Sequence, residues 1–205
     1  MAANEDRPLE GACTCGAVRY LMKSKPMFVH CCHCRWCQRE TGASFALNAL
    51  IEADRVVLLK GEPEVVNTPS NSGKGQKIAR CPICHIALWS NYAGAGDAVR
   101  FVRVGTLKES DRLPPDIHIF TASKQPWVVL PANTPAVEEY YDRTKYWPKE
   151  SLERRRALPG LADVGGQCGD RPAEAGADDD DVEVEVVVSH GLRPSRASSS
   201  VAGWP

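Results

Sequence analysis

The stretch HCCHCRWCQRETG, residues 30–42, places four cysteines and two histidines in its first eight positions. Three structures are compatible with so many sulfur atoms: a disulfide knot, a closed metal site, or a metal site that keeps one position open for chemistry. Each would organise the surrounding chain differently, so the fold and the function depend on which one forms.

The compartment decides between disulfides and metal. The N-terminal sequence MAANEDRPLEGAC is acidic and has no apolar segment of the secretory type, and no stretch approaches the roughly 18 apolar residues of a membrane span. We therefore expect a cytoplasmic protein with no membrane partner. Thiols are kept reduced there, and clustered cysteines then favour bound metal over disulfides.

Composition predicts one domain with appendages. The chain has 205 residues, 43% hydrophobic residues and a net charge of -1, but residues 159–205 carry nine acidic residues against three arginines, so the remainder is mildly basic. That excess suits a small anionic ligand and is too weak to predict a nucleic-acid partner. We expect an N-terminal arm (1–8), a β domain (9–150), a short polar segment (151–158) and a disordered acidic tail (159–205).

Short β-prone runs separated by Gly, Pro, Asn and Ser fill the predicted domain. They are 17–22, 45–51, 55–61, 64–68, 76–81, 87–92, 98–105 and 116–120. Only residues 34–45 and 135–144 have the character of short helical turns. The fold class predicted from this pattern is mainly β, a small β-sandwich-like fold with few short helices. The cysteines add the prediction that it is a zinc fold with two zinc sites.

Two cysteine pairs far apart in the chain predict the first of these sites. CTC supplies Cys13 and Cys15, which share one face if the chain is extended there, and CPIC supplies Cys81 and Cys84 at the spacing of a zinc knuckle. Together the two pairs make a four-cysteine set, which is the pattern of a closed structural zinc site.

The opening stretch is then left with Cys32, Cys34 and Cys37. Strand alternation puts the first two on one face and Cys31 on the other, so three thiolates can bind one ion and leave its fourth position open. The alternative is a second closed site, completed by His30, His33 or Cys31. His30 is the most plausible of these, since it shares the alternation of Cys32 and Cys34.

An open three-thiolate zinc site favours thiol chemistry over hydrolysis. Zinc with three thiolates has a net charge of -1, so it is a weak Lewis acid and a poor source of hydroxide. A soft, sulfur-rich ion instead favours an added thiol as its fourth ligand. Arg35 and Arg39 flank the cluster, and we consider both as contacts for a carboxylate of that thiol, with ordinary surface arginines as the alternative.

The quoted cysteine motifs, with GACTCGAVRY, CHCRWCQRETGASF, VRVGTL and DIHIFTASKQPWVVL in this order, resemble the glutathione-dependent formaldehyde-activating (GFA) family. Its domain is shared with centromere protein V, and the resemblance covers residues 9–147. It implies two zinc ions per chain and glutathione as co-substrate. The implied activity joins glutathione to formaldehyde to give S-hydroxymethylglutathione, formally a carbon-sulfur lyase in reverse. By motif match, the implied ligands are Cys13, Cys15, Cys81 and Cys84 for structural zinc, and Cys32, Cys34 and Cys37 for catalytic zinc.

Some residues depart from the family pattern or have no derived role. His85 follows the CPIC motif, where the family commonly has Gly because the turn favours φ > 0. Trp127 is expected in the core and His118 in a structural or pocket-lining position. Cys168, alone in the acidic tail, is expected to be incidental.

Two further functions stay open at this point. One is a zinc-stabilised interaction module without catalysis, which the relation to centromere protein V allows, although the acidic rather than basic extension argues against it. The other is a GFA-like lyase that acts on a specialised thiol adduct. Sequence alone leaves the true substrate and the oligomeric state undetermined.

Overall fold

The structure is a computed structural model that describes residues 7–70 and 72–161. Residues 162–205 of the predicted acidic tail, with Cys168, lie outside the described residues, as do residues 1–6 of the predicted N-terminal arm. The described start of the predicted tail is not disordered throughout, because Leu161 is buried. In the described part of the chain, no helix has the length and apolar character needed to cross a membrane.

Ten strands, three α-helices and five 3₁₀ turns make up the described residues. The strands are β1 (Leu9–Ala12), β2 (Arg19–Met22), β3 (Phe28–Cys32), β4 (Ala46–Glu52), β5 (Val56–Lys60), β6 (Glu64–Thr68), β7 (Gln76–Arg80), β8 (Ala87–Tyr92), β9 (Val99–Arg103) and β10 (Ile117–Ile119). The helices are α1 (Arg35–Thr41), α2 (Arg143–Tyr146) and α3 (Lys149–Arg156), with 3₁₀ turns at Ala53–Arg55, Gly96–Ala98, Val104–Thr106, Ser110–Arg112 and Thr121–Ser123.

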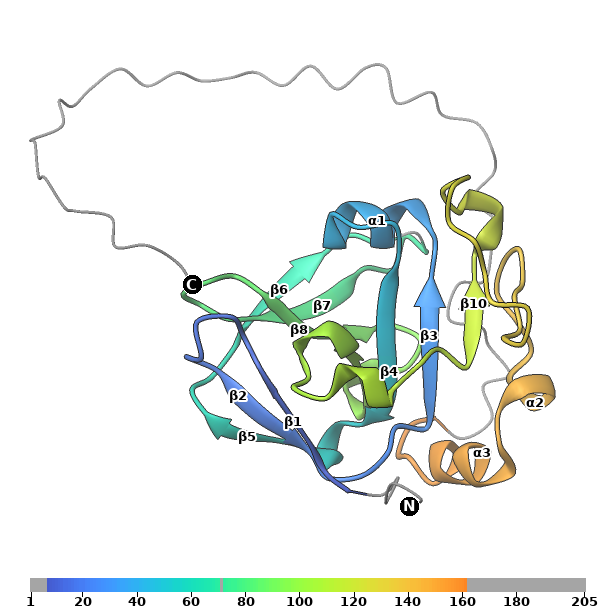
Figure 1. Ribbon diagram of the computed structural model, residues 1–205. Coiled ribbons are helices and arrows are strands. Elements are labelled where there is room, and N and C mark those ends of the chain that lie inside the picture. The colour runs from blue at the N-terminus through green and yellow to red at the C-terminus, as the bar shows by residue number, and fades with distance from the viewer. Residues whose placement is uncertain (1–6, 71, 162–205) are drawn as a thin grey trace, which may run out of the picture. The chain divides into compact units, whose positions relative to one another are not determined.

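The strands form two sheets (Figure 1). The smaller sheet has the order β1-β2-β5, and the larger has the order β10-β3-β4-β9-β8-β7-β6. All neighbouring strands pair antiparallel except β10, which lies parallel to β3 at the edge of the larger sheet. The prediction of a mainly β fold with few short helices is therefore confirmed.

The centre of the larger sheet is buried on both faces. Every residue of β3 is buried, and so are six of the seven residues of β4; the seventh is partly exposed. Alternate residues of these strands belong to two separate cores: Val29 packs with residues of the smaller sheet, whereas Phe28 packs with residues 137–161. Strands covered on both sides have near-continuous apolar sequences, and this explains why apolar and polar residues do not alternate along β4.

Residues 135–144, predicted as a helical turn, are not helical up to Asp142. They instead lie along the outer edge of β10, where His118 N donates to Pro135 O (2.8 Å) and Val137 N donates to His118 O (2.9 Å). The edge strand thus supplies hydrogen-bond partners that local propensity does not anticipate. The other predicted helical segment, 34–45, contains α1, and β1 and β3 lie outside the eight predicted runs.

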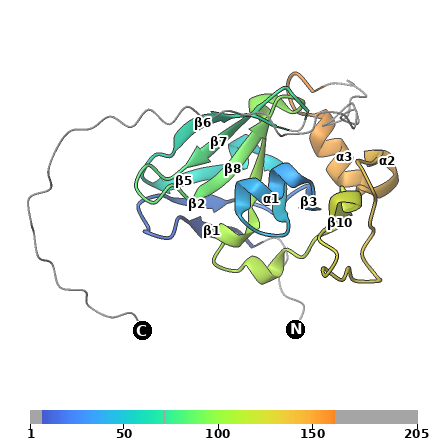
Figure 2. The same cartoon turned by 90° about the horizontal axis from the view of Figure 1, so that it is seen from above.

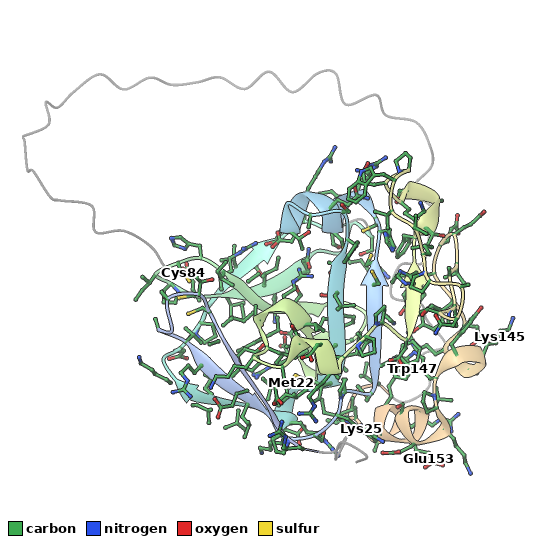
Figure 3. The ribbon with its side chains drawn as sticks, in the orientation of Figure 1. Met22, Lys25, Cys84, Lys145, Trp147 and Glu153 are labelled. Atoms are coloured by element: carbon green, nitrogen blue, oxygen red, sulfur yellow. The ribbon has the colours of Figure 1, made fainter. Side chains whose placement is uncertain are left out.

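The prediction that Trp127 belongs to the core is wrong, because its exposed fraction is 72%. The tryptophan that is buried in a core is Trp147, which is labelled in Figure 3. Its ring stacks on Phe28 with centroids 5.2 Å apart, and its Nε1–H donates to the hydroxyl of Tyr141 at 2.6 Å. A buried indole needs both an apolar neighbour and an acceptor, and Tyr141 supplies the acceptor.

Helix α3 includes most of the segment 151–158, which was expected to be a polar appendage to the β domain. Its Arg154 makes two hydrogen bonds to the carboxylate of Glu52 at the end of β4, at 2.7 and 2.6 Å. A third bond runs from Arg154 to the carbonyl of Lys25 (3.1 Å), and Figure 3 shows Lys25 beside this helix. The helix is therefore attached to the larger sheet through a buried charge pair.

The Glu52–Arg154 pair should make a large contribution to stability. Burial alone raises the pKa of Glu52, but the hydrogen bonds from Arg154 outweigh it, and the net pKa is below 4.5. The stabilisation is therefore complete above about pH 4.5 and is lost as the pH falls through the lower folded pKa. We expect Arg154→Met to lower the free energy of unfolding by about 3 kcal/mol at pH 7 because it strands a buried carboxylate. Urea denaturation measures the change.

The control for this prediction is Arg156→Met, on the exposed side of the same helix, which should change stability by no more than about 0.5 kcal/mol. Adding Glu52→Gln to Arg154→Met should recover part of the loss, because the unpaired charge is removed. Equal stability of the Arg154 and Arg156 variants would contradict the role given to this pair.

Candidate metal centre and pocket

Four cysteines from two turns meet in what we call the four-thiol cluster: Cys13, Cys15, Cys81 and Cys84. All four sulfurs lie within 4.8 Å of one another. Cys15 Sγ is 3.5 Å from Cys13 Sγ and 3.7 Å from Cys81 Sγ. Thiolates around a tetrahedral zinc ion, at bonds of about 2.3 Å, are separated by about 3.8 Å. The donors and their spacing therefore fit the predicted structural zinc, although its presence stays a prediction.

The two pairs are presented by turns and not by strands. β1 ends at Ala12, so Cys13 and Cys15 lie in a turn in which Gly16 has φ of 70° and its N–H donates to Cys13 O. The conditional prediction of an extended chain at 13–15 is therefore wrong, although the two sulfurs do meet. In the second turn, His85 has φ of 58°. This is the left-handed conformation expected where the family commonly has glycine.

Backbone amides point at the sulfurs of the four-thiol cluster. Val18 N donates to Cys13 Sγ (3.3 Å), and Ile83 N donates to Cys81 Sγ (3.4 Å). Hydrogen bonds from the backbone N–H groups of Cys15 and Ile86 lower the pKa of the Cys84 thiol to about 6. Such donors stabilise thiolates, which are the form that binds metal.

A second group, the three-thiol cluster, consists of Cys32, Cys34 and Cys37, with sulfurs within 4.8 Å of one another. Cys32 is the last residue of β3, and Cys37 lies in the first turn of α1. Cys34 is the N-cap of that helix, and its Sγ accepts a hydrogen bond from Cys37 N (3.4 Å). The strand and the helix adjoin in both orthogonal views (Figure 2), and this junction gathers the three sulfurs.

The charge of the three-thiol cluster is concentrated on one sulfur. Hydrogen bonds from Cys32 and then Cys37 lower the pKa of Cys34 to about 3, whereas the pKa of Cys32 is raised well above its usual value by its interaction with Cys34. These opposite shifts favour a negative charge within the cluster. A cation bound by all three sulfurs would displace the remaining thiol protons.

A pocket lined by aromatic side chains opens on the three-thiol cluster. All three cysteines line it, together with Trp36, Tyr92, Phe101, Phe120 and Tyr140. Its polar lining residues include Arg103, which is buried at the end of β9. Arg103 donates to Asn48 Oδ1 (2.6 Å) and to Ser90 Oγ (3.3 Å). The pocket therefore combines apolar walls, a cluster of sulfurs and a fixed positive charge.

The residues considered as a fourth ligand of the second zinc make contacts with other groups. His30 lines the pocket, but its Nε2 is 2.6 Å from the hydroxyl of Tyr141. Cys31 and His33 belong to a separate group with His118. In the described residues, none of these candidates lies within 4.8 Å of all three thiols of the cluster. As placed here, the three-thiol cluster keeps an open position.

The sequence did not predict the buried Arg103 as a pocket residue, and the two arginines that it did suggest as substrate contacts are exposed. Arg35 is exposed and donates to Gln38 Oε1 (3.1 Å), and Arg39 is exposed in the last turn of α1. Neither is among the described residues that line the pocket. Arg103 lies in VRVGTL, one of the stretches that resemble the family, but only strand pairing brings it to the cluster. The one sign of a special role is its charge, because it is one of two arginines in the otherwise apolar run VRFVRVG.

Comparison with known proteins identifies the family. Residues 8–123 match the sequence profile of the family described as "Glutathione-dependent formaldehyde-activating enzyme". The chain belongs to this family. It is 28% identical over 126 residues to a protein of Halomonas elongata named "Putative glutathione-dependent formaldehyde-activating enzyme", covering 60% of this chain and 80% of that protein. A crystal structure of a Rhodobacter sphaeroides protein overlaps 62% of this chain and 99% of its own, with 17% identity and a TM-score of 0.38.

The two cysteine clusters should respond differently to the same substitution. Cys81→Ser should lose one zinc ion per chain and lower the Tm by about 10 °C, because metal binding by the four-thiol cluster is coupled to folding. Cys34→Ser should also lose one zinc ion but keep a Tm within a few degrees of wild type, since serine is a good helix N-cap. Atomic emission and calorimetry measure both. Similar melting of the two variants would contradict the division into structural and open sites.

Proposed function

We propose that this member of the GFA family is a zinc-dependent enzyme that adds glutathione to formaldehyde to give S-(hydroxymethyl)glutathione, and catalyses the reverse carbon-sulfur cleavage. The observation that carries the proposal is the three-thiol cluster, which lines a pocket and has no fourth protein ligand among the described residues. The matching family description and the name of the Halomonas elongata relative support the choice of thiol and aldehyde. We further propose that the reaction takes place in the cytoplasm, where glutathione maintains the thiol pool.

The reaction needs a thiolate held close to a small carbonyl. Zinc bound by Cys32, Cys34 and Cys37 would supply a soft fourth position at which an added thiol loses its proton near neutral pH. The thiolate sulfur attacks the carbonyl carbon, a C–S bond forms, and the electron pair of the C=O bond moves to oxygen. The oxygen then takes up a proton. The product, a hydroxymethyl thioether, contains all the atoms of the thiol and the aldehyde.

The chain's own residues provide charge balance around that sulfur. Zinc with three thiolates has a net charge of -1, and a further thiolate makes it -2, which is unfavourable in an apolar pocket. Arg103 is the buried cation of the pocket and is held in place by Asn48 and Ser90. Its guanidinium offsets the negative charge and favours the thiolate form of the substrate.

His30 is a neutral group in the same pocket. Burial lowers its pKa to about 3, so it carries no charge at neutral pH. Trp147 donates to the hydroxyl of Tyr141, and the same hydroxyl lies 2.6 Å from His30 Nε2, within hydrogen-bond distance. His30 is thereby fixed as a neutral pocket residue and adds no second positive charge beside the sulfurs.

The aromatic walls favour a second candidate reaction of the same type. Glutathione carries two carboxylates, whereas the lining around Trp36, Phe101 and Tyr140 is largely apolar. A thiol adduct or aldehyde with an apolar group would bury more surface there. Comparing kcat/KM for formaldehyde with that for an aromatic aldehyde, each with glutathione, separates the two.

Arg35 and Arg39 remain our candidates for the glutathione carboxylates, and replacing both with alanine should raise the KM for glutathione only.

The proposed activity is tested by following glutathione-dependent loss of formaldehyde by NMR. Cys34→Ser should reduce the enzyme-catalysed rate at least about 100-fold while the protein stays folded, because one soft ligand is removed and the N-cap is kept. Cys168→Ser, in the acidic tail, is the matched control and should retain the full rate. Wild-type turnover by Cys34→Ser without its second zinc would contradict the mechanism.

A second test concerns Arg103. We expect Arg103→Met to lower kcat/KM about 10-fold or more and to move the acidic limb of the pH–rate profile to higher pH, because losing a nearby cation raises the pKa of a thiol. The control is Arg100→Met on the same strand. Arg100 lies over the ring of Trp89, 4.5 Å from its centroid, and its loss should leave the profile unchanged. Identical profiles for both variants would remove Arg103 from the mechanism.

A further inference from the structure

A third group of potential metal ligands, which we call the thiol–imidazole cluster, includes two residues of the stretch 30–42 that are not part of the three-thiol cluster. It consists of Cys31 Sγ, His33 Nε2 and His118 Nδ1, all within 4.8 Å of one another. The residues are almost fully buried, with exposed fractions of 2%, 0% and 6%. Cys31 and His118 are register partners in the parallel pair β3–β10, so the sheet itself brings two of the ligands together.

The spacing of these atoms is close to that of ligands around one ion. His33 Nε2 is 3.0 Å from His118 Nδ1 and 3.6 Å from Cys31 Sγ. Bonds of about 2.0 Å to nitrogen and 2.3 Å to sulfur separate neighbouring ligands by about 3.4 Å for two nitrogens and 3.6 Å for nitrogen and sulfur. The two measured distances are within about 0.4 Å of these separations, and the ligand atoms of Cys31 and His118 lie within 4.8 Å of each other.

Hydrogen bonding alone does not satisfy the cluster. A ring nitrogen offers either one proton or one lone pair, so His33 Nε2 cannot serve both Cys31 and His118 fully. The far nitrogens, His33 Nδ1 and His118 Nε2, have no hydrogen-bond partner in the described part of the protein. No neighbour therefore fixes either tautomer, and each ring can hold its proton on the far nitrogen while its near nitrogen offers a lone pair.

The charge of the ligand set indicates which ion fits. One thiolate and two neutral imidazoles leave a net charge of +1 with Zn²⁺ and zero with Cu⁺. No carboxylate in the described residues joins the group to offset a positive charge. A buried uncompensated charge is costly, so the neutral complex is favoured in this dry position. Copper also accepts trigonal coordination by one cysteine and two histidines, which requires no added water.

We propose that Cys31, His33 and His118 bind one Cu(I) ion at a third metal site. The site is separate from both zinc clusters in its ligands. It shares a chain segment with the three-thiol cluster, in which Cys31 and His33 alternate with Cys32 and Cys34. The proposal does not depend on the enzymatic reaction, and its test uses metal content and not activity.

The test is an anaerobic titration of the zinc-loaded, full-length protein with Cu(I) supplied in a weak competing chelator. We expect one copper ion retained per chain after gel filtration, with no zinc released, and a copper X-ray absorption spectrum that contains one sulfur and two nitrogen neighbours. Copper that enters only as zinc leaves, or that has an all-sulfur shell, would contradict the proposal. These measurements on wild type do not depend on whether any variant folds.

Variants then locate the copper. His118→Gln should lose the retained copper and keep the zinc content of wild type, because His118 lies far in sequence from every zinc motif. His30→Gln is the matched control: it is a buried histidine of β3 outside the thiol–imidazole cluster, and it should keep the copper. Copper retained by His118→Gln with an unchanged spectrum, or a third zinc ion that this variant removes, would overturn the assignment.

Discussion

The constraint on which the rest of the structure depends is the burial of β3 on both faces. One face packs toward the smaller sheet and the other toward residues 137–161. A strand covered on both sides cannot slip by one residue without moving every side chain to the wrong core. Its alternation is therefore fixed, and with it the separation of Cys31 from Cys32. Cys31 and Cys32, which belong to two different clusters of candidate metal ligands, can be neighbours in the chain because the strand directs them to opposite sides.

The junction between β3 and α1 adds a second constraint. Cys34 serves as helix N-cap and as the most acidic thiol of the three-thiol cluster, and both roles use its sulfur as a hydrogen-bond acceptor. The short helix then delivers Cys37 from its first turn, and Gly42 in the left-handed conformation ends it. The local backbone thus forms a ready-made concentration of negative charge. The helix start and the cluster of sulfurs therefore share one residue, Cys34.

Much of the candidate site could be predicted from sequence because its signals are local. The spacing of CTC, CPIC and CHCRWC placed the seven cysteines into two groups, and the structure gathers the same groups. The family turn predicted a left-handed residue at His85, which has φ of 58°. The turn at Cys13–Cys15 reached the expected meeting of sulfurs by a different backbone. A strand and a tight turn can both bring the side chains of residues i and i+2 together, so the spacing of Cys13 and Cys15 alone could not distinguish them.

The residue positions that could not be predicted from sequence are those that depend on contacts between distant segments of the chain. His118 meets Cys31 only because β10 adds parallel to β3, and Arg103 reaches the pocket only because β9 pairs with β4. Trp127 and Trp147 have similar aromatic character. Their opposite positions depend on whether a stacking partner such as Phe28 and an acceptor such as Tyr141 lie within reach. Neither condition leaves a periodic pattern in the sequence.

The pocket also extends beyond the part of the chain that defines the family. The family match ends at residue 123, yet Tyr140 lines the pocket and Tyr141 pairs with His30. That later segment is attached through Trp147 on Phe28 and through Arg154 on Glu52. The cysteine motifs and part of the aromatic pocket wall therefore come from different parts of the chain. Membership in the family accounts for the sulfurs, whereas the shape of the aromatic pocket also depends on how residues 137–161 pack against β3.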